Sequence, residues 1–441
     1  MCKTKMAVDA STPRNTRTPK SRTPSASRPA ADSSFDPSSS YTSSAAYSGS
    51  SGFRLTSDTS ISSGASLSSF RDSLPENPHI YDFSEICSAT NNFLARRYSS
   101  SSSTPSWRCT LRGRDVIVFQ RKFRRKLQVN QVRERLSVIG RSHHVSIIKL
   151  VGACMSGDHI YLVYDFVNGA NLSDCLRNKK NLNFTVLSSW ISRMQVATDL
   201  AEGLDYIHNK TGLTLNFVHN HIKSSAIIVT EPSFNARISH FGAAQMCGEI
   251  EEESESAKQM EAIQEASSSS PSSSTKSKDA KPSRSSNTQF EGVRGYMAPE
   301  YQSTGVATQK SDVYAFGVVI LELLSGDEPL KFKYDKKTGE FVTNSVIDTA
   351  RVVLEGNPNG SGGVEGRLRR WMDRRLKDSF PVEVVEEVTR VALSCVHVDP
   401  DKRPNMGRVA GKISRLYLKS RIWSDNMRTP TDILSTSFAP R

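Results

Sequence analysis

The stretch that decides the fold of this chain runs from Ser311 to Leu324 and reads SDVYAFGVVILELL. A helix with this sequence is apolar on nearly every side, and such a helix is buried inside a core. Another helical pattern lies upstream, with apolar residues three and four positions apart: Ile191, Met194, Ala197, Leu200, Ala201, Leu204 and Ile207. Together the two patterns predict a large, mostly helical unit around a central buried helix.

Strand-like runs occur upstream of these helices, at residues 115–119 and 159–166. They flank a helical pattern at 132–139, and a helix-like run at 86–93 follows residues with capping-box spacing. We therefore expect an α+β chain in which a small β-rich unit with one main helix precedes the large helical unit.

Composition sets the expected boundaries of the ordered chain. Residues 1–78 are dominated by Ser, Thr, Pro, Ala and Arg, and too few large apolar side chains occur there to offset the entropy of ordering. Residues at about 248–290 run from acidic to serine-rich to basic, which is typical of a disordered insertion. We predict an ordered domain at 79–421 around this insertion, and a tail at 422–441.

The net charge of +13 favours acidic partners such as anionic lipid, nucleic acid or an acidic protein surface. Much of the excess lies in the N-terminal tail and in the run from Arg121 to Lys126, which we expect to be solvated. No recognised module or basic-aromatic platform accompanies this charge, so we do not expect specific nucleic-acid binding. A nucleic-acid binder would instead show steep salt dependence.

The segment from Met1 to Met6 lacks the apolar core of a signal peptide, and no stretch of about 18 apolar residues occurs in the chain. We therefore expect a cytoplasmic protein. Its seven cysteines are an odd number without paired spacing, which favours free thiols over disulfides or a zinc site.

The N-terminal tail carries two candidate regulatory features. Cys2 excludes N-myristoylation, while its palmitoylation beside basic residues would add peripheral contact with an anionic plasma membrane. Three pairs among basic residues are candidate proline-directed phosphorylation sites or parts of a plain linker: Thr12-Pro13, Thr18-Pro19 and Thr23-Pro24.

Six motifs follow one another along the chain: Tyr161-Leu162-Val163-Tyr164-Asp165-Phe166, His219 with Lys223, Phe241-Gly242, Gly295-Tyr296-Met297-Ala298-Pro299-Glu300, Ser311 to Gly317, and Asp401-Lys402-Arg403-Pro404. In this order they resemble the protein kinases, most closely the plant receptor-like kinases and their branch with LysM ectodomains. The resemblance covers about residues 80–420. It implies a bilobal protein kinase-like fold, with an N-lobe at about 79–164 and a C-lobe at about 168–421.

The resemblance assigns structural roles to five residues. It implies that Glu300 and Arg403 form a buried ion pair, which would be costly to break from one side. It also implies that Asp312 caps the backbone of the catalytic loop, and that His219 and Phe241 stack in an apolar spine. We therefore expect an intact fold.

Phosphoryl transfer depends on positioning and electrostatics, so each lost charge matters. Alignment puts Phe119 where the family has its phosphate-binding Lys. The Glu partner of that Lys falls on Arg135, although a one-residue error would select Glu134 instead. Arg121 is expected on the same face of the strand as Phe119, because alternate residues of a strand share a face. Some kinases carry this Lys on another strand, so Arg121 is a candidate to replace it.

The two catalytic acids of the family are also replaced. His221 stands in place of the base that orients the substrate hydroxyl, and His240 in place of the Asp that binds both metals. Ala226 replaces the Asn ligand of magnesium, whereas Lys223 is retained. Mg²⁺ binding is therefore not expected.

The nucleotide site is altered in a further way. Residues 99–106 form a serine-proline tract where glycines normally let the backbone approach the phosphates. Val293 replaces the Thr that contacts the catalytic Asp in this family. Whether ATP still binds is left open, and five residues mark its candidate pocket: Val118, Tyr164, Phe166, Val167 and Ile228.

The histidines themselves allow three interpretations. Neutral imidazoles at His221 and His240 suit a soft metal such as Zn²⁺ better than Mg²⁺. Protonated imidazoles would attract nucleotide phosphates without a metal. The third interpretation is that both positions are relaxed in a pocket without chemistry.

These observations favour a catalytically deficient kinase homologue, or pseudokinase, that requires no cofactor. It would act as an adaptor or allosteric partner of plant receptor-like kinases. The alternative is an active Ser/Thr kinase that uses ATP through non-standard residues.

Overall fold

The computed structural model describes residues 78–98, 104–178, 187–212, 217–250, 293–334, 339, 341–356 and 363–428. The chain divides into two units, Met1–Leu67 and Ser68–Arg441, and every described residue belongs to the second. The expectations for the N-terminal tail, most of the serine-proline tract at 99–106, most of the insertion and the last thirteen residues concern parts of the chain outside this description.

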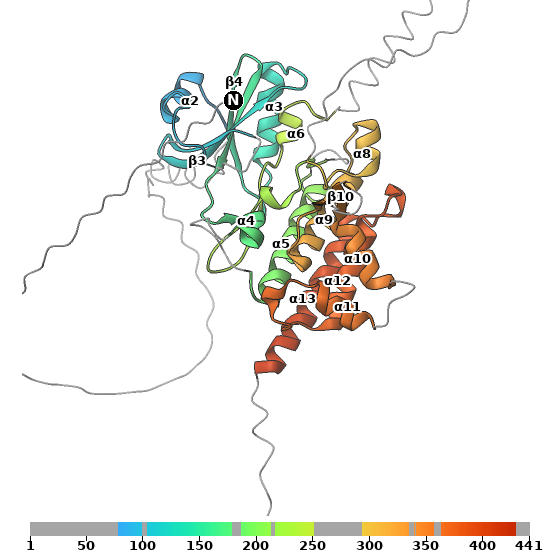
Figure 1. The fold of residues 1–441 in the computed structure, drawn as a ribbon. Coiled ribbons are helices and arrows are strands. Elements are labelled where there is room, and N and C mark those ends of the chain that lie inside the picture. The colour runs from blue at the N-terminus through green and yellow to red at the C-terminus, as the bar shows by residue number, and fades with distance from the viewer. Residues whose placement is uncertain are drawn as a thin grey trace, which may run out of the picture. The chain divides into compact units, whose positions relative to one another are not determined.

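A five-stranded sheet forms the smaller part of the second unit, in the order β1-β4-β5-β3-β2. Only β1 pairs in parallel, with β4. Its strands are β1 (His79–Ile80), β2 (Ser106–Leu111), β3 (Arg114–Lys122), β4 (Leu150–Ser156) and β5 (His159–Asp165). Helix α3 (Val129–Gly140) packs into the main core on one face, and α2 (Phe83–Ala89) covers the other (Figure 1).

Helices form the larger part, and their centre is α9 (Gln309–Ser325), where nearly every side chain from residue 311 onward is buried. The prediction of a central buried helix is confirmed. The others are α4 (Leu172–Arg177), α5 (Trp190–Asn209), α6 (Ala243–Met246), α8 (Pro299–Thr304), α10 (Val346–Glu355), α11 (Val364–Trp371), α12 (Val382–Cys395) and α13 (Met406–Arg428). Most of them gather below the sheet in Figure 1, whereas α6 lies beside α3.

Shorter elements complete the larger part. Three-residue 3₁₀ turns occur at Ser224–Ala226, Arg374–Leu376 and Pro400–Lys402. Strands β6 (Ala170–Asn171), β7 (Ile227–Val229) and β8 (Ala236–Ile238) form a small antiparallel sheet, and β9 (Leu330–Tyr334) and β10 (Phe341–Ser345) form a hairpin.

Three boundaries differ from the sequence expectations. Helix α2 ends at Ala89 because Asn91, Asn92 and Phe93 adopt left-handed backbone conformations, which stop a helix. Helix α13 continues beyond residue 421 to Arg428, with Ser420 buried and accepting a hydrogen bond from Trp190 Nε1 at 2.9 Å. Residues 248–250, which we expected in the insertion, belong to the described structure.

Candidate functional site

Asp312 at the start of α9 holds the loop from residue 218 to 223, which we call the catalytic loop. Its carboxylate accepts the backbone N–H of His219 at 2.7 Å and of Asn220 at 2.8 Å. His208 Nε2 lies 3.1 Å from the same carboxylate. Burial alone would raise the pKa of Asp312, but His208 and His219 lower it below its ordinary value. Asp312 therefore accepts hydrogen bonds from the backbone of the catalytic loop, as the resemblance implies.

The ion pair implied for Glu300 and Arg403 is also present. Both guanidinium Nη atoms of Arg403 donate to the Glu300 carboxylate, at 2.6 and 2.7 Å. Arg403 is buried and also donates to the carbonyls of His397 and Lys310. Helix α8 is thereby joined to the segment before α13.

His219 and Phe241 are both buried, but in different contacts from the expected stack. The ring next to Phe241 is that of Phe217, with 5.3 Å between centroids. His219 Nε2 donates to the Ser239 carbonyl at 3.0 Å, while its Nδ1 accepts the backbone N–H of His221 at 3.2 Å. Burial lowers the pKa of His219 to about 4, so the ring is neutral.

The register of β3 decides which of its side chains face the catalytic loop. Phe119 pairs with Leu162, and Arg121 with Ile160, on the face that packs into the main core. Val118 lies on the opposite face, within the smaller cluster beneath α2. The expectation that Val118 lines a nucleotide pocket is therefore corrected, because strand alternation points it away.

The other four expected pocket residues make contacts within the domain. The Tyr164 hydroxyl is buried and donates to the Phe241 carbonyl at 2.9 Å. The ring of Phe166 is covered by the Arg108 guanidinium, whose carbon is 3.6 Å from the ring centroid. Ile228 is buried in the main core, and Val167 packs against it.

His240 lies beside Phe119, with 4.5 Å between ring centroids and an edge-on orientation. It is buried, has a φ of +66°, and its Nδ1 has no hydrogen-bond partner within the described structure. Burial, followed by the nearby charge of Arg121, holds its pKa well below the ordinary value. The positions aligned with the family's Lys and metal-binding Asp thus form an uncharged aromatic contact.

Arg135 on α3 points toward the segment after Gly242, and its Nη1 donates to the Gln245 carbonyl at 2.7 Å. Glu134 is exposed, so the one-residue alternative places no acid in the cleft. Gly242 has a φ of +79°, and a Cβ there would lie 2.7 Å from Ile139 of α3. The absence of a side chain at Gly242 lets α6 pack closely against α3.

A residue that the sequence had not indicated, Glu249, completes the site. Its carboxylate accepts from Asn220 Nδ2 at 3.0 Å and lies 3.1 Å from His221 Nε2. Arg121 Nη1 is 3.7 Å from the same carboxylate and 3.3 Å from His221 Nε2. The Arg121 and Glu249 side chains are only 10% and 8% exposed, so this Arg is not on the solvated face we expected. We call Arg121, Asn220, His221 and Glu249 the cleft cluster.

Local backbone geometry brings Glu249 into this position. Gly248 has a φ of +68°, and a Cβ there would lie 2.7 Å from the Arg125 carbonyl. The backbone N–H of Arg124 donates to the Cys247 carbonyl at 2.9 Å. The only sequence signal was this glycine, directly ahead of an acid that looked like the first residue of an acidic run.

Electrostatics within the cluster favour a neutral imidazole beside an ionised carboxylate. Burial and then Arg121 lower the pKa of His221. Burial would raise the pKa of Glu249, but its contact with His221, the charge of Arg121 and the hydrogen bond from Asn220 lower this pKa overall. With the Nε2–H tautomer, His221 donates to Glu249 and Arg121 supplies the opposite charge.

The same residues test whether Mg²⁺ fits the site. A hard cation of this kind needs several oxygen ligands. The two aligned ligand positions carry the buried methyl of Ala226 and the neutral ring of His240, and Glu249 is already bonded within the cluster. These residues do not fit Mg²⁺.

Comparison with known proteins agrees with the motifs and the fold. The family model described as "Protein kinase domain" matches residues 116–412, which is more than half of the chain. The chain belongs to the protein kinase family. Its α+β fold, with a sheet-rich N-lobe and a helical C-lobe, is that of the family, as the sequence predicted.

The curated relatives are plant receptor-like kinases. LysM domain receptor-like kinase 3 of Arabidopsis thaliana is 29% identical over 361 residues, which cover 82% of this chain and 50% of the relative. Protein LYK5 of the same plant is 28% identical over 79% of this chain and 45% of its own length. This kinase chain therefore spans about half the length of these two relatives.

A solved structure shares the fold. It is the pseudokinase domain of BIR2, described as an immune regulator of the RLK/Pelle family. The TM-score is 0.54 at 21% sequence identity, over 82% of this chain and 97% of that one. At this identity the likeness shows the fold alone.

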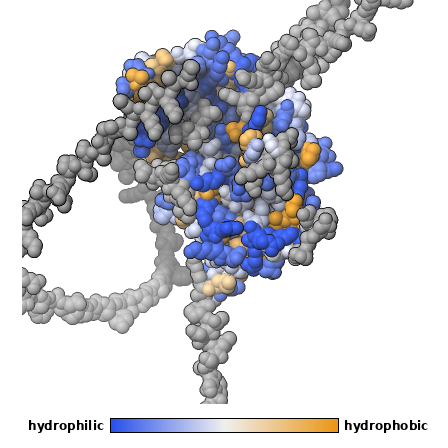
Figure 2. Space-filling model, viewed as in Figure 1, coloured by the Kyte–Doolittle hydropathy of each residue, from blue (hydrophilic) through white to orange (hydrophobic). Residues whose placement is uncertain are grey.

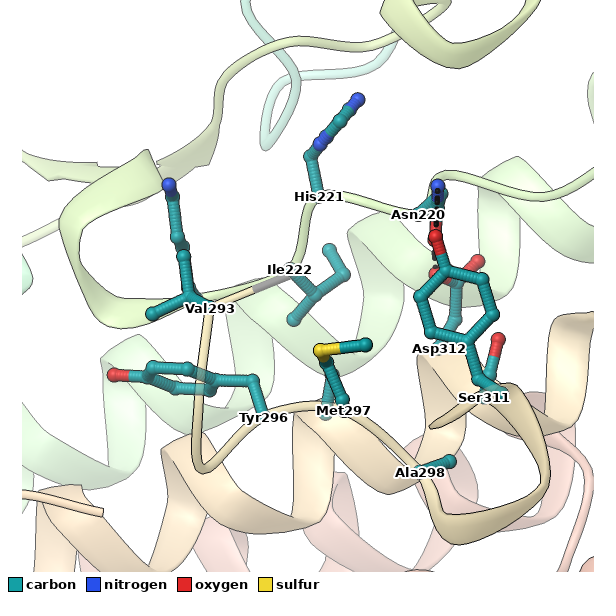
Figure 3. A pocket seen from close by; sticks show the side chains of 12 residues that line it. Asn220, His221, Ile222, Val293, Tyr296, Met297, Ala298, Ser311 and Asp312 are labelled. Carbon is teal, nitrogen blue, oxygen red and sulfur yellow. Dashed lines mark hydrogen bonds between the residues drawn. The ribbon is translucent and has the colours of Figure 1, made fainter. Parts of the chain in front are cut away.

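The kinase domain has a small pocket of about 60 Å³ between its catalytic loop and the segment at 293–298. Figure 3 shows Asn220, Ser311 and Asp312 on one side of it, with Val293 and Tyr296 on the other. Lys223 also lines it, and Val293 is 44% exposed. Ligand sites usually occupy about 300 to 1,000 Å³, so this pocket holds little more than a solvent molecule or two.

Two further findings concern the described part of the kinase domain. None of its helices combines the length and apolar character that a membrane span requires. No group of three or more His, Cys, Asp or Glu side chains lies together there as metal ligands. Within the described residues, the soft-metal hypothesis therefore depends on two imidazoles without a third ligand. These are His221 and His240, whose ring centroids lie 6.2 Å apart.

Proposed function

We propose that this kinase homologue is catalytically deficient and acts as a signalling adaptor or allosteric partner. The observation that carries the proposal is the cleft itself. An edge-on contact between Phe119 and His240 replaces the Lys and Asp of the family, and the Glu249 carboxylate lies 3.7 Å from the Arg121 guanidinium. Loss of one transition-state donor typically costs about a hundredfold to a thousandfold in rate, so several losses together approach the uncatalysed rate.

The scaffold supports the second half of the proposal. Asp312 still holds the catalytic loop, and Arg403 still binds Glu300. The molecule therefore keeps the surfaces of a kinase domain in fixed positions without the groups that phosphoryl transfer requires.

The likeness to receptor-like kinases and the exposed aromatic side chains of one hairpin support a receptor-like kinase as the partner. Figure 2 shows a mostly hydrophilic face with small separate hydrophobic patches. On the β9–β10 hairpin, Phe332, Tyr334 and Phe341 are 60%, 57% and 71% exposed. Exposed aromatic side chains are typical of protein interfaces. Binding to a purified LysM-type receptor kinase domain should weaken with Phe332→Ser and Phe341→Ser, and unchanged binding would contradict this partner surface.

We place this activity on the cytoplasmic side of the plasma membrane, with the basic N-terminal tail in peripheral contact with anionic lipid. The tail sequence and Cys2 support this placement. Cell fractionation of a Cys2→Ser variant tests it: the variant should leave the membrane fraction, and a distribution equal to that of wild type would contradict the contact.

The rival is an active Ser/Thr kinase in which Arg121 takes the role of the missing Lys. The position of Arg121 on β3, on the same face as Phe119 and close to Glu249, favours this alternative function. Thermal unfolding with ATP separates the two functions. We expect any shift in melting temperature to be the same with Mg²⁺, Mn²⁺ or EDTA, whereas a shift that needs a divalent metal would support the active kinase.

A further inference from the structure

The Glu249 carboxylate is surrounded by polar side chains in the way that a bound anion would be. Its Oε2 accepts a hydrogen bond from Asn220 Nδ2 at 3.0 Å and lies 3.1 Å from His221 Nε2, and its Oε1 lies 3.7 Å from Arg121 Nη1. These groups come from β3 and the catalytic loop, far apart in sequence. Buried donors that converge on one negative group describe an anion site.

The anion site is not saturated by a carboxylate. Within the described structure, Arg121 Nε and His240 Nδ1 are buried without a hydrogen-bond partner. The His240 ring lies 6.2 Å from that of His221, beside the cleft cluster. The carboxylate reaches Asn220 and His221 through Oε2 and leaves 3.7 Å between Oε1 and Arg121, whereas a phosphate offers three or more oxygens with greater charge. The leftover hydrogen-bonding capacity therefore suits a larger anion than Glu249.

We propose that Glu249 is an internal ligand of this cleft, and that a phosphate group of a nucleotide or polyphosphate binds there by displacing it, without a divalent metal. The external anion and the Glu249 carboxylate exclude one another because both require Arg121 and His221. Binding is thereby coupled to the position of residues 243–250. The proposal rests on the proposed function, since a site that needed Mg²⁺ would bind phosphate differently.

The connection to the rest of the domain follows from hydrogen bonds already described. Arg135 of α3 donates to the Gln245 carbonyl, and Gln245 Nε2 donates to the Val218 carbonyl at 2.8 Å. Withdrawal of Glu249 therefore acts on a short segment that is bonded to both α3 and the catalytic loop. An anion in the cleft would loosen this segment relative to its neighbours.

Binding of tripolyphosphate, ATP and adenosine in EDTA tests the proposal by calorimetry. Glu249→Gln removes the charge and keeps an amide that can bond with its neighbours. We expect Glu249→Gln to bind tripolyphosphate and ATP at least about tenfold more tightly than wild type, because the competing charge is gone. Adenosine affinity should stay unchanged. A gain for ATP without one for tripolyphosphate would show that the base, rather than the phosphate, is recognised.

Glu134→Gln is the matched control, because it removes one exposed carboxylate from α3. It should bind all three compounds as wild type does. Equal tripolyphosphate affinity for Glu249→Gln and wild type would overturn the proposal, as would an equal gain for adenosine, which indicates a generally loosened cleft.

Hydrogen exchange on the wild-type chain gives a second test that does not depend on a variant. Saturating tripolyphosphate in EDTA should increase exchange in residues 243–250, and unchanged exchange there would overturn the displacement. Neither measurement reads phosphate transfer. A kinase activity found in the wild-type chain would contradict the proposed function and leave these comparisons of metal-free binding intact.

Discussion

Two buried carboxylates bind the catalytic loop, and they do so in different ways. Asp312 accepts backbone N–H groups, including that of Asn220, whereas Glu249 bonds side chains, including the amide of the same Asn220. Backbone contacts tolerate changes in the loop's side chains, so Asp312 maintains the kinase fold whether the loop carries Asp or His. Glu249 depends on the particular side chains present here. The fold is that of the family, and the cleft cluster depends on the side chains at positions 121, 220, 221 and 249.

The largest expected effect comes from the scaffold side of the comparison. Asp312→Ala leaves two buried N–H groups and His208 without their partner, and should lower the free energy of unfolding by about 3 to 5 kcal/mol. Urea denaturation measures it. Asp348→Ala, at an exposed surface ion pair, is the control and should change little. Equal losses in the free energy of unfolding for Asp312→Ala and Asp348→Ala would contradict the role of Asp312 in the scaffold.

The cleft should dominate the response to mild acid. The pKa values of His219, His221 and His240 are all lowered by burial, whereas unfolded imidazoles take protons near pH 6.5. Between pH 6.5 and 5 the unfolded state therefore binds more protons, so stability present above pH 6.5 is lost as the pH falls. At pH 5, each of these imidazoles contributes up to about 2 kcal/mol to the loss of folding stability.

Denaturation curves at pH 7 and pH 5 measure this loss. His240→Asn removes one titrating ring and keeps a residue type that tolerates a positive φ, so the pH dependence should become shallower. If the variant and the wild type lose the same stability between these pH values, His240 is not buried as a neutral ring.

Sequence patterns predicted the scaffold because its parts lie within regular elements. The helix at 309–325 is apolar all round, and its first turn carries Asp312 in a family motif. The alternation of β3 likewise placed Arg121 and Phe119 on one face. The prediction for Val118 was wrong because the same alternation puts this residue on the opposite face of β3.

Glu249 escaped prediction for a physical reason. Its place depends on a left-handed glycine, on packing against residue 125, and on a partner more than a hundred positions away, Arg121 in β3. Composition placed it in an acidic run instead. Charge patterning in one dimension cannot distinguish the first acid of a solvated segment from a buried partner of an arginine.

An intermediate effect should come from the cleft cluster itself. Glu249→Ala leaves the buried Arg121 without its counter-charge and should lower the free energy of unfolding by about 1 to 3 kcal/mol. Combining it with Arg121→Met should recover part of that loss, since both charges are then absent. A double-mutant cycle in urea measures the coupling, and strictly additive losses would show that these side chains do not interact.

The smallest expected effect distinguishes Arg135 from its neighbour. Arg135→Ala removes the hydrogen bond to the Gln245 carbonyl and should cost about 0.5 to 1.5 kcal/mol by thermal or urea unfolding. Glu134→Ala, on the exposed side of α3, should change little. The reverse order would mean that the acid, rather than the arginine, faces the cleft.

The most direct test of the central claim is transfer of labelled phosphate from ATP by the purified chain, with Mg²⁺ and with Mn²⁺, to itself and to a general substrate protein. The account predicts transfer no greater than that of a Lys223→Ala variant. Transfer that Lys223→Ala abolishes, and that a surface control such as Lys419→Ala leaves unchanged, would contradict it.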